Sequence, residues 1–240
     1  MELKQITNRI YYMEAYEVTD RPILGYIKGD KYSLAIDAGN SKNHVLEFYS
    51  LLENKGLPKP KYTVITHYHW DHTFGMHAIS GNSIVSNLTN IKLEEMKNWN
   101  WTENDMDIRI EKGFDIEFCK NHIVKEYKNL DDIKVVTGDI IFNDELSIDL
   151  GGIKCYLMHI VSPHTDDTIV AYIPSEKILF IGDSDGGDYN NLNGKYDKVK
   201  LKKYINFIEN LDYDISIVGH GEPESKDNTL KYLYEELSKC

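Results

Sequence analysis

An eleven-residue stretch decides the fold, and it reads Tyr62-Thr63-Val64-Ile65-Thr66-His67-Tyr68-His69-Trp70-Asp71-His72. A short apolar run leads directly into four side chains that can bind a metal ion. In an extended segment, residues two apart project to the same side, so His67 and His69 can face one ion. Asp71 and His72, in the turn that follows, can face another. A lone histidine would more often be an ordinary loop residue, but this density of ligands at a strand end predicts two adjacent metal sites.

The other ligands must come from elsewhere, because four residues of one short loop cannot complete two coordination spheres. Three candidates in the second half of the chain share one context. His164, Asp183 and His220 each stand where an apolar strand pattern ends. Because sites are built on the loops at strand ends, we expect these side chains to meet the first cluster in space.

The remaining pattern predicts an α/β sandwich in one domain of residues 1–240. Strand patterns alternate with turn signals, and a helical insertion at about 87–128 interrupts them. The expected strands are 9–13, 23–28, 32–36, 62–66, 134–136, 140–142, 146–150, 153–158, 168–173, 178–181 and 215–218. Helices are expected after Ser41 and over 196–211 and 226–238, in addition to two or three in the insertion.

Composition excludes several classes of partner. The formal net charge of −12 repels phosphate backbones and anionic lipids, so neither nucleic acid nor a membrane surface is expected. No apolar run approaches the roughly 18 residues of a membrane-spanning helix, and the first residues lack the layout of a signal peptide. We therefore expect a cytoplasmic protein that acts on a small-molecule substrate. The 17 tyrosines leave a homodimer open without locating an interface.

Four further residues are candidates for contact with a substrate. Trp99 and Trp101, in the insertion, either form the walls of a cap over the metals or anchor the insertion to the sandwich. His159 precedes His164 by five residues and could contact a ligand or the substrate. Tyr189 could protonate a leaving group. His44, in a polar helical stretch, is expected to be solvated.

Taken in order along the chain, these residues resemble the metallo-β-lactamase superfamily. The resemblance rests on the His-x-His-x-Asp-His pattern of residues 67–72, on His164, on Gly182-Asp183 and on His220. It implies a four-layer αββα sandwich. It also implies that a first metal is held by His67, His69 and His164, and a second by Asp71, His72 and His220. Asp183 would bridge the two.

Individual branches of that superfamily are matched only in part. Residues 164–180 look like the β-lactamase branch, which commonly has a cysteine where Asp183 stands and a lysine shortly after it. Trp70 within the motif resembles glyoxalase II, a thioesterase. Quorum-signal lactonases place a tyrosine three residues after the bridging aspartate, where this chain has Gly186. The resemblance therefore predicts the chemistry of the site more closely than its substrate.

The resemblance implies a hydrolase with two zinc ions, although the same ligands suit iron or manganese. A hydroxide bridging the metals would attack a small ester, lactone, thioester, amide or phosphoester, and Asp71 would orient that nucleophile. Two alternatives remain. One is a mononuclear non-haem iron oxygenase resembling persulfide dioxygenases, which would use mainly His67, His69 or His164 with Asp183. The other is a non-catalytic metal-binding protein.

Overall fold

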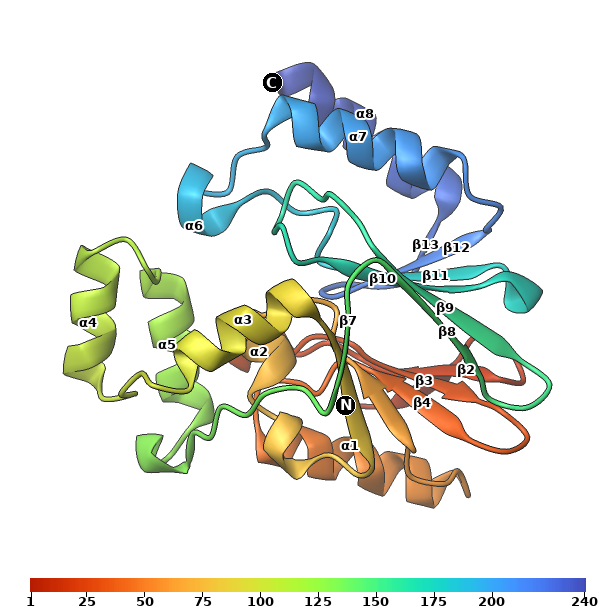
Figure 1. Ribbon diagram of the computed structural model, residues 1–240, viewed down its shortest axis with the longest axis horizontal. Helices are drawn as coiled ribbons and strands as arrows, with labels where there is room; N and C mark the ends of the chain where they lie inside the picture. The colour runs from red at the N-terminus through yellow and green to blue at the C-terminus, as the bar shows by residue number, and fades with distance from the viewer.

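Two β-sheets pack face to face between layers of helices (Figure 1) in the computed structural model, which describes residues 1–240. The first sheet contains seven strands in sequence order, and its last four strands run parallel to one another. Its strands are β1 (Leu3–Gln5), β2 (Ile10–Met13), β3 (Leu24–Lys28), β4 (Ser33–Ile36), β5 (Tyr62–Val64), β6 (Asn82–Ser86) and β7 (Ile140–Phe142).

The second sheet contains six strands in the order β13-β12-β11-β10-β9-β8. Only the pair β11 and β12 is parallel. The strands are β8 (Glu145–Asp149), β9 (Lys154–His159), β10 (Ile169–Ile173), β11 (Ile178–Gly182), β12 (Ile215–Val218) and β13 (Glu224–Ser225). Every residue of β11 is buried, as its continuous apolar sequence predicts for a strand covered on both faces.

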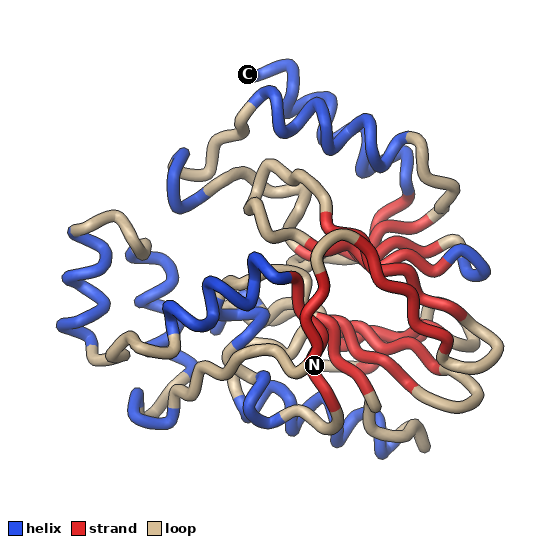
Figure 2. The backbone as a smooth tube through the Cα atoms, viewed as in Figure 1, coloured by secondary structure: helices blue, strands red, loops and turns tan.

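Helices cover the outer face of each sheet (Figures 1 and 2). Helix α1 (Lys42–Asn54) lies on the first sheet, and α7 (Lys198–Glu209) and α8 (Lys226–Lys239) lie on the second. The predicted cap of α1 is confirmed, since the Ser41 side chain accepts a hydrogen bond from the His44 amide. This order of helix, sheet, sheet and helix is the predicted four-layer sandwich. Short helices complete the chain: α2 (Trp70–Thr73), α6 (Tyr189–Leu192), η1 (Glu17–Thr19), η2 (Met76–Ala78), η3 (Leu130–Asp132) and η4 (Pro174–Glu176).

The main core lies between the two sheets. Nineteen buried residues form one apolar cluster there, and they come from strands of both sheets and the adjoining turns. Ile27 and Leu34 of the first sheet belong to it together with Leu157 and Phe180 of the second. This burial fixes how the two sheets face each other, and thereby which strand ends meet.

The insertion forms three helices, α3 (Asn87–Met96), α4 (Glu103–Glu111) and α5 (Glu117–Glu126), as predicted for residues 87–128. They extend beyond the sheets at one end of the molecule (Figure 1). A separate apolar cluster attaches them to the sandwich, built around Trp70, Phe74, Met106 and Ile123. The position of the insertion is therefore set by packing against α2, the helix that follows the first histidines.

Two expectations from the sequence are wrong. Residues 134–136 form no strand; the ladder with β6 begins at Ile140, because the Asp139 carboxylate accepts the Ser83 amide in place of a backbone carbonyl. His44 is fully buried instead of solvated, and its Nδ1 accepts a hydrogen bond from the Asn40 amide at 3.4 Å. Its neighbours in the sequence are polar, but the face of α1 that carries it also carries Val45 and Phe48 and packs inward.

Candidate metal centre

The site lies where strands of both sheets end. His67 follows β5, Asp183 follows β11, His220 follows β12, and His164 lies in the loop between β9 and β10. Main-chain hydrogen bonds join the sheets at this point, from the Ile169 amide to the Thr66 carbonyl at 2.7 Å. The backbone that carries the predicted ligands is therefore fixed from both sides of the sandwich.

The first group of candidate ligands contains three histidines. Nε2 of His67 and Nε2 of His164 each lie 3.0 Å from Nδ1 of His69. Nitrogen ligands at about 2.0–2.1 Å in a tetrahedron are separated by about 3.3 Å, so the observed spacing is close to that of a zinc site. The three ring nitrogens converge on one point, and a divalent metal can take up their lone pairs.

The second group contains Asp71, His72, Asp183 and His220. Oδ2 of Asp71 lies 3.0 Å from Nε2 of His72 and 3.0 Å from Nε2 of His220. Nε2 of His72 and Oδ1 of Asp183 are buried and lie 3.4 Å apart, but neither atom makes a hydrogen bond. Because orphaned buried polar atoms are costly, they indicate that this pocket is built to hold a cation.

Asp183 stands between the two groups. Its Oδ1 lies 3.4 Å from Nε2 of His72, and its Oδ2 lies 4.0 Å from Nε2 of His67 and 3.8 Å from Nε2 of His164. One carboxylate thus presents an oxygen to each group. All seven predicted ligands are brought together, in the two sets that the resemblance implied.

A buried carboxylate outside both groups orients one histidine in each. Oδ2 of Asp37 lies 2.7 Å from Nδ1 of His72 and accepts its proton, which leaves Nε2 free to bind metal. The Thr66 hydroxyl donates to the same carboxylate and lies 3.1 Å from Nδ1 of His67. A hydroxyl can donate once and accept as well, so Thr66 fixes the His67 tautomer in the same way. The sequence pattern indicated neither role, although Asp37 follows a strand as the candidate ligands do.

The other two histidines of the first group also have outer partners. Nδ1 of His164 donates to the Gly187 carbonyl at 2.9 Å, which leaves its Nε2 for the metal. Nε2 of His69 lies 3.3 Å from the Asn190 amide group, which also contacts the Tyr68 hydroxyl at 2.8 Å. With Nδ1 facing the metal, His69 carries its proton on Nε2, and rotation of the Asn190 amide offers an oxygen to accept it.

Burial and neighbouring charges shift the pKa values of the candidate histidine ligands in opposite directions. Burial, with His164 beside it, lowers the pKa of His69 to about 3. Burial opposes protonation of His220, but the carboxylates of Asp183 and Asp71 outweigh it and raise its pKa to about 9. Burial likewise opposes protonation of His72, but the carboxylates of Asp71, Asp37 and Asp183 hold its pKa well above the ordinary value. Without metal, His72 and His220 are therefore protonated near neutral pH, and a bound cation would displace a proton from each.

A cavity of about 250 Å³ opens over both groups. Besides the ligands, it is lined by Asp20, Ile116, Phe118, Cys119, Tyr189 and Asn190. Ile116, Phe118 and Cys119 come from the start of α5, so the insertion does form one wall. Of the four predicted substrate residues, only Tyr189 lines this cavity, with its ring centroid 6.3 Å from that of His164.

Trp99 and Trp101 lie elsewhere. Their rings pack on the Arg109 guanidinium, and the Trp101 ring packs edge-on against Phe74. Trp99 and Trp101 therefore anchor the insertion to the sandwich, and they do not form the walls of a cap over the candidate ligands. His159 is also outside the cavity lining; its Nε2 lies 2.7 Å from the Asp166 carbonyl. Ile116 and Phe118 line the cavity, but they belong to no sequence motif. Nothing in the sequence therefore predicted that they would lie near the candidate ligands.

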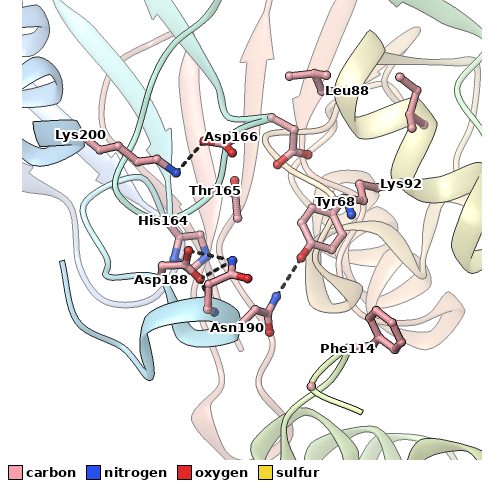
Figure 3. Close-up of a pocket in the computed structure, with 14 residues that line it drawn as sticks. Tyr68, Leu88, Lys92, Phe114, His164, Thr165, Asp166, Asp188, Asn190 and Lys200 are labelled. Atoms are coloured by element: carbon pink, nitrogen blue, oxygen red, sulfur yellow. Dashed lines mark hydrogen bonds and ion pairs between the residues drawn. The ribbon is translucent and has the colours of Figure 1, made fainter. Parts of the chain in front are cut away.

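A second cavity of about 380 Å³ adjoins the first, and both are lined by His164 and Asn190. Figure 3 shows the second cavity, in which Asn190 and Tyr68 point toward one another and Lys200 is paired with Asp166. Leu88 and Phe114 of the insertion line this second cavity as well. Asn190 therefore stands at the boundary between the metal-facing cavity and its neighbour.

Glycines allow the ligand strands to approach one another. A Cβ on Gly219 would collide with Oδ1 of Asp183, and Gly182 has a positive φ of 52° beside Thr66. A larger side chain at Gly219 would displace a candidate ligand, and one at Gly182 would displace Thr66, which orients His67. The glycine before His220 and the glycine before Asp183 thus belong to the geometry of the site.

Comparisons with known proteins agree with this architecture. The profile of the metallo-beta-lactamase superfamily matches residues 25–220. A metallo-beta-lactamase from Pontibacter korlensis is structurally similar, with a TM-score of 0.67 and 19% identity over 100% of this chain and 99% of that one. The DIM-1 metallo-beta-lactamase gives a TM-score of 0.66 and 16% identity, over 100% of this chain and 98% of that chain.

A third similar structure is the sec-alkylsulfatase Pisa1 from Pseudomonas sp., with a TM-score of 0.68 and 14% identity. It aligns with 98% of this chain but only 41% of its own. No curated protein sequence matches the chain. None of the helices has the length and apolar character needed to cross a membrane. The profile match, the two-sheet fold and the ligand groups lead to one conclusion: the chain belongs to the metallo-β-lactamase superfamily.

Proposed function

We propose that the protein is a hydrolase that uses two divalent metal ions, with zinc as the native metal. The observation that carries the proposal is the pair of ligand groups joined by Asp183, with two ligand atoms buried and unpartnered. Neutral imidazoles and carboxylates are the ligands of catalytic zinc, and His69 and His164 of the first group line the cavity, so an ion held there would be accessible to a substrate. Two such ions would polarise a substrate oxygen and acidify a water molecule enough to ionise near neutral pH.

The residues of the chain then have distinct tasks. Asp71 lines the cavity and is placed to accept a hydrogen bond from the attacking water and orient it. Asp37 and Thr66 hold His67 and His72 in the required tautomers. Tyr189, at the cavity wall, is the side chain available to protonate a leaving group. Water adds across the scissile bond of a small ester, lactone, thioester, amide or phosphoester and gives an acid and an alcohol, thiol or amine.

Elemental analysis of protein purified without added metal tests this proposal, combined with a hydrolysis assay on one substrate of each class. We expect about two zinc ions per chain, and loss of metal and turnover in His69→Ala and Asp183→Ala. His77→Ala is the matched control, because His77 is hydrogen-bonded to the Phe74 carbonyl and belongs to neither ligand group. Full metal content and full activity in both ligand variants would contradict the assignment.

One observation favours a second candidate function. The first group with Asp183 Oδ2 forms three histidines and a carboxylate around one point, which also suits mononuclear non-haem iron. An oxygenase of that kind would contain about one iron per chain and consume oxygen. The same elemental analysis separates the two candidates. Two metals without turnover on any substrate would instead support a non-catalytic metal-binding protein.

A further inference from the structure

The cavity over the ligand groups has an unusual balance of charge and apolar surface for a site that would hold metal ions. None of the eleven residues that line it is a lysine or an arginine. Its only ionisable residue outside the ligand set, besides Cys119 and Tyr189, is Asp20, whose Oδ1 lies 3.8 Å from Nδ1 of His220. Within this cavity, no side chain is therefore placed to pair with a carboxylate or phosphate on the substrate.

Part of the lining is apolar. Ile116, Phe118 and Cys119 at the start of α5 line the cavity, and Tyr189 lines it as well. Phe118 is 53% exposed, although its ring packs against His122 with centroids 4.1 Å apart. A large apolar side chain that stays exposed at the mouth of a cavity has surface left to bury against a ligand.

From these two features we infer that the site takes an uncharged acyl ester, lactone or thioester with a short apolar substituent, which lies against Phe118 and Ile116. This inference rests on the proposed function and narrows its substrate class. Two divalent ions, two carboxylate ligands and one hydroxide would carry a formal charge of about +1, and no basic side chain in the cavity would add to it. An anionic substituent gains no ion pair in the cavity and loses its hydration there.

Substrate pairs that differ in one group test the inference on the metal-loaded protein. The p-nitrophenyl esters of butanoic acid and of succinic acid (as its monoester) differ by a methyl against a carboxylate. We expect kcat/KM to be at least about tenfold higher for the butanoate. Phe118→Ala should lower kcat/KM for the hexanoate about tenfold and leave that for the acetate nearly unchanged, because the acetyl group is too short to reach the apolar wall.

A charge placed in the wall gives a sharper test. Phe118→Lys should shift the preference toward the succinate monoester. Phe114→Lys is the matched control, because Phe114 belongs to the same insertion and is 62% exposed but lines the second cavity. Both variants add one positive charge at an exposed position, so a general electrostatic effect would appear in both. An equal shift in the two, or no preference for the butanoate in the unmodified protein, would overturn the inference.

Binding supplies a readout independent of turnover. Saturation-transfer NMR with hexanamide and with adipamate, its carboxylate counterpart, should detect hexanamide alone, and Phe118→Ala but not Phe114→Ala should abolish the signal. If this pattern holds and no ester, lactone or thioester is hydrolysed, the hydrolase proposal fails while the assignment of the cavity stands. If esters are hydrolysed but adipamate binds as well as hexanamide, the inference fails and the hydrolase proposal stands.

Discussion

Nδ1 of His72 lies 2.7 Å from Oδ2 of Asp37, and both side chains are almost completely buried. Through the Thr66 hydroxyl, the same carboxylate also orients His67. Asp37, in the turn after β4, therefore orients one candidate ligand in each of the two groups. Asp37 adopts a left-handed conformation with φ of 63°, which carries its side chain back over the end of the strand. The two groups of candidate ligands are therefore linked by hydrogen bonds to one carboxylate.

Asp37→Asn should weaken binding of both metals by about 10- to 100-fold, because outer partners of this kind set the ligand tautomer. The amide keeps the size and the backbone preference of aspartate, but it offers a single acceptor where His72, Thr66 and the Thr66 amide all donate. Competition with a chelator of known affinity measures the effect. Asp139→Asn is the control, since Asp139 serves Ser83 in the same sheet. Loss of only one metal would contradict the shared role.

Asn190→Ala should reduce affinity for the first metal by less than Asp37→Asn does, because Asn190 is exposed to two cavities and water can replace its amide. Asn190→Asp keeps the acceptor for Nε2 of His69 and should restore binding. Titration of the metal-free protein with zinc gives both values. Asn191→Ala is the control for the α6 turn, because the Asn191 side chain hydrogen-bonds to Asp188 and belongs to neither ligand group. Equal affinities in Asn190→Ala and the unmodified protein would remove Asn190 from the centre.

Zinc binding at pH 7 should release protons, because His220, with a pKa of about 9, and His72 must lose theirs to bind metal. Apparent affinity should therefore rise with pH between pH 6 and 9. In the metal-free protein the raised pKa of His220 stabilises the fold fully below its unfolded value near 6.5, and this contribution is lost as pH rises through about 9. Calorimetry in two buffers of different ionisation enthalpy counts the protons released. An uptake of protons on zinc binding would contradict the raised pKa values of His220 and His72.

Arg21→Met should lower the free energy of unfolding by ~3 kcal/mol or more, because it leaves a buried carboxylate unpaired. The Arg21 guanidinium binds Glu126 at 2.7 and 3.1 Å, and the Glu126 side chain is only 3% exposed. This pair ties the end of α5 to the segment that carries Asp20. Thermal unfolding measures the loss, and Arg21→Met combined with Glu126→Gln should recover part of it. Lys177→Met, which breaks the exposed pair with Asp212, should change stability by less than ~1 kcal/mol.

Sequence alone determined the candidate ligands and the α/β layers. His67, His69, Asp71 and His72 are close in sequence, and His164, Asp183 and His220 each follow an apolar strand. Such local patterns indicate which residue types lie at strand ends. Because the strand ends of one sandwich lie close together, these residues could be expected to meet. The helices of the insertion were likewise predictable from their local spacing.

Only the tertiary structure decided what surrounds the ligands. Asp37 lies 35 residues before His72, and Phe118 reaches the cavity only because the insertion packs on Trp70 and Phe74. Nothing in the sequence separated the tryptophans that anchor the insertion from the phenylalanine that lines the cavity, because all are aromatic residues in one helical segment. Which of them faces the site depends on helix packing over long sequence separations, and that is a property of the folded chain.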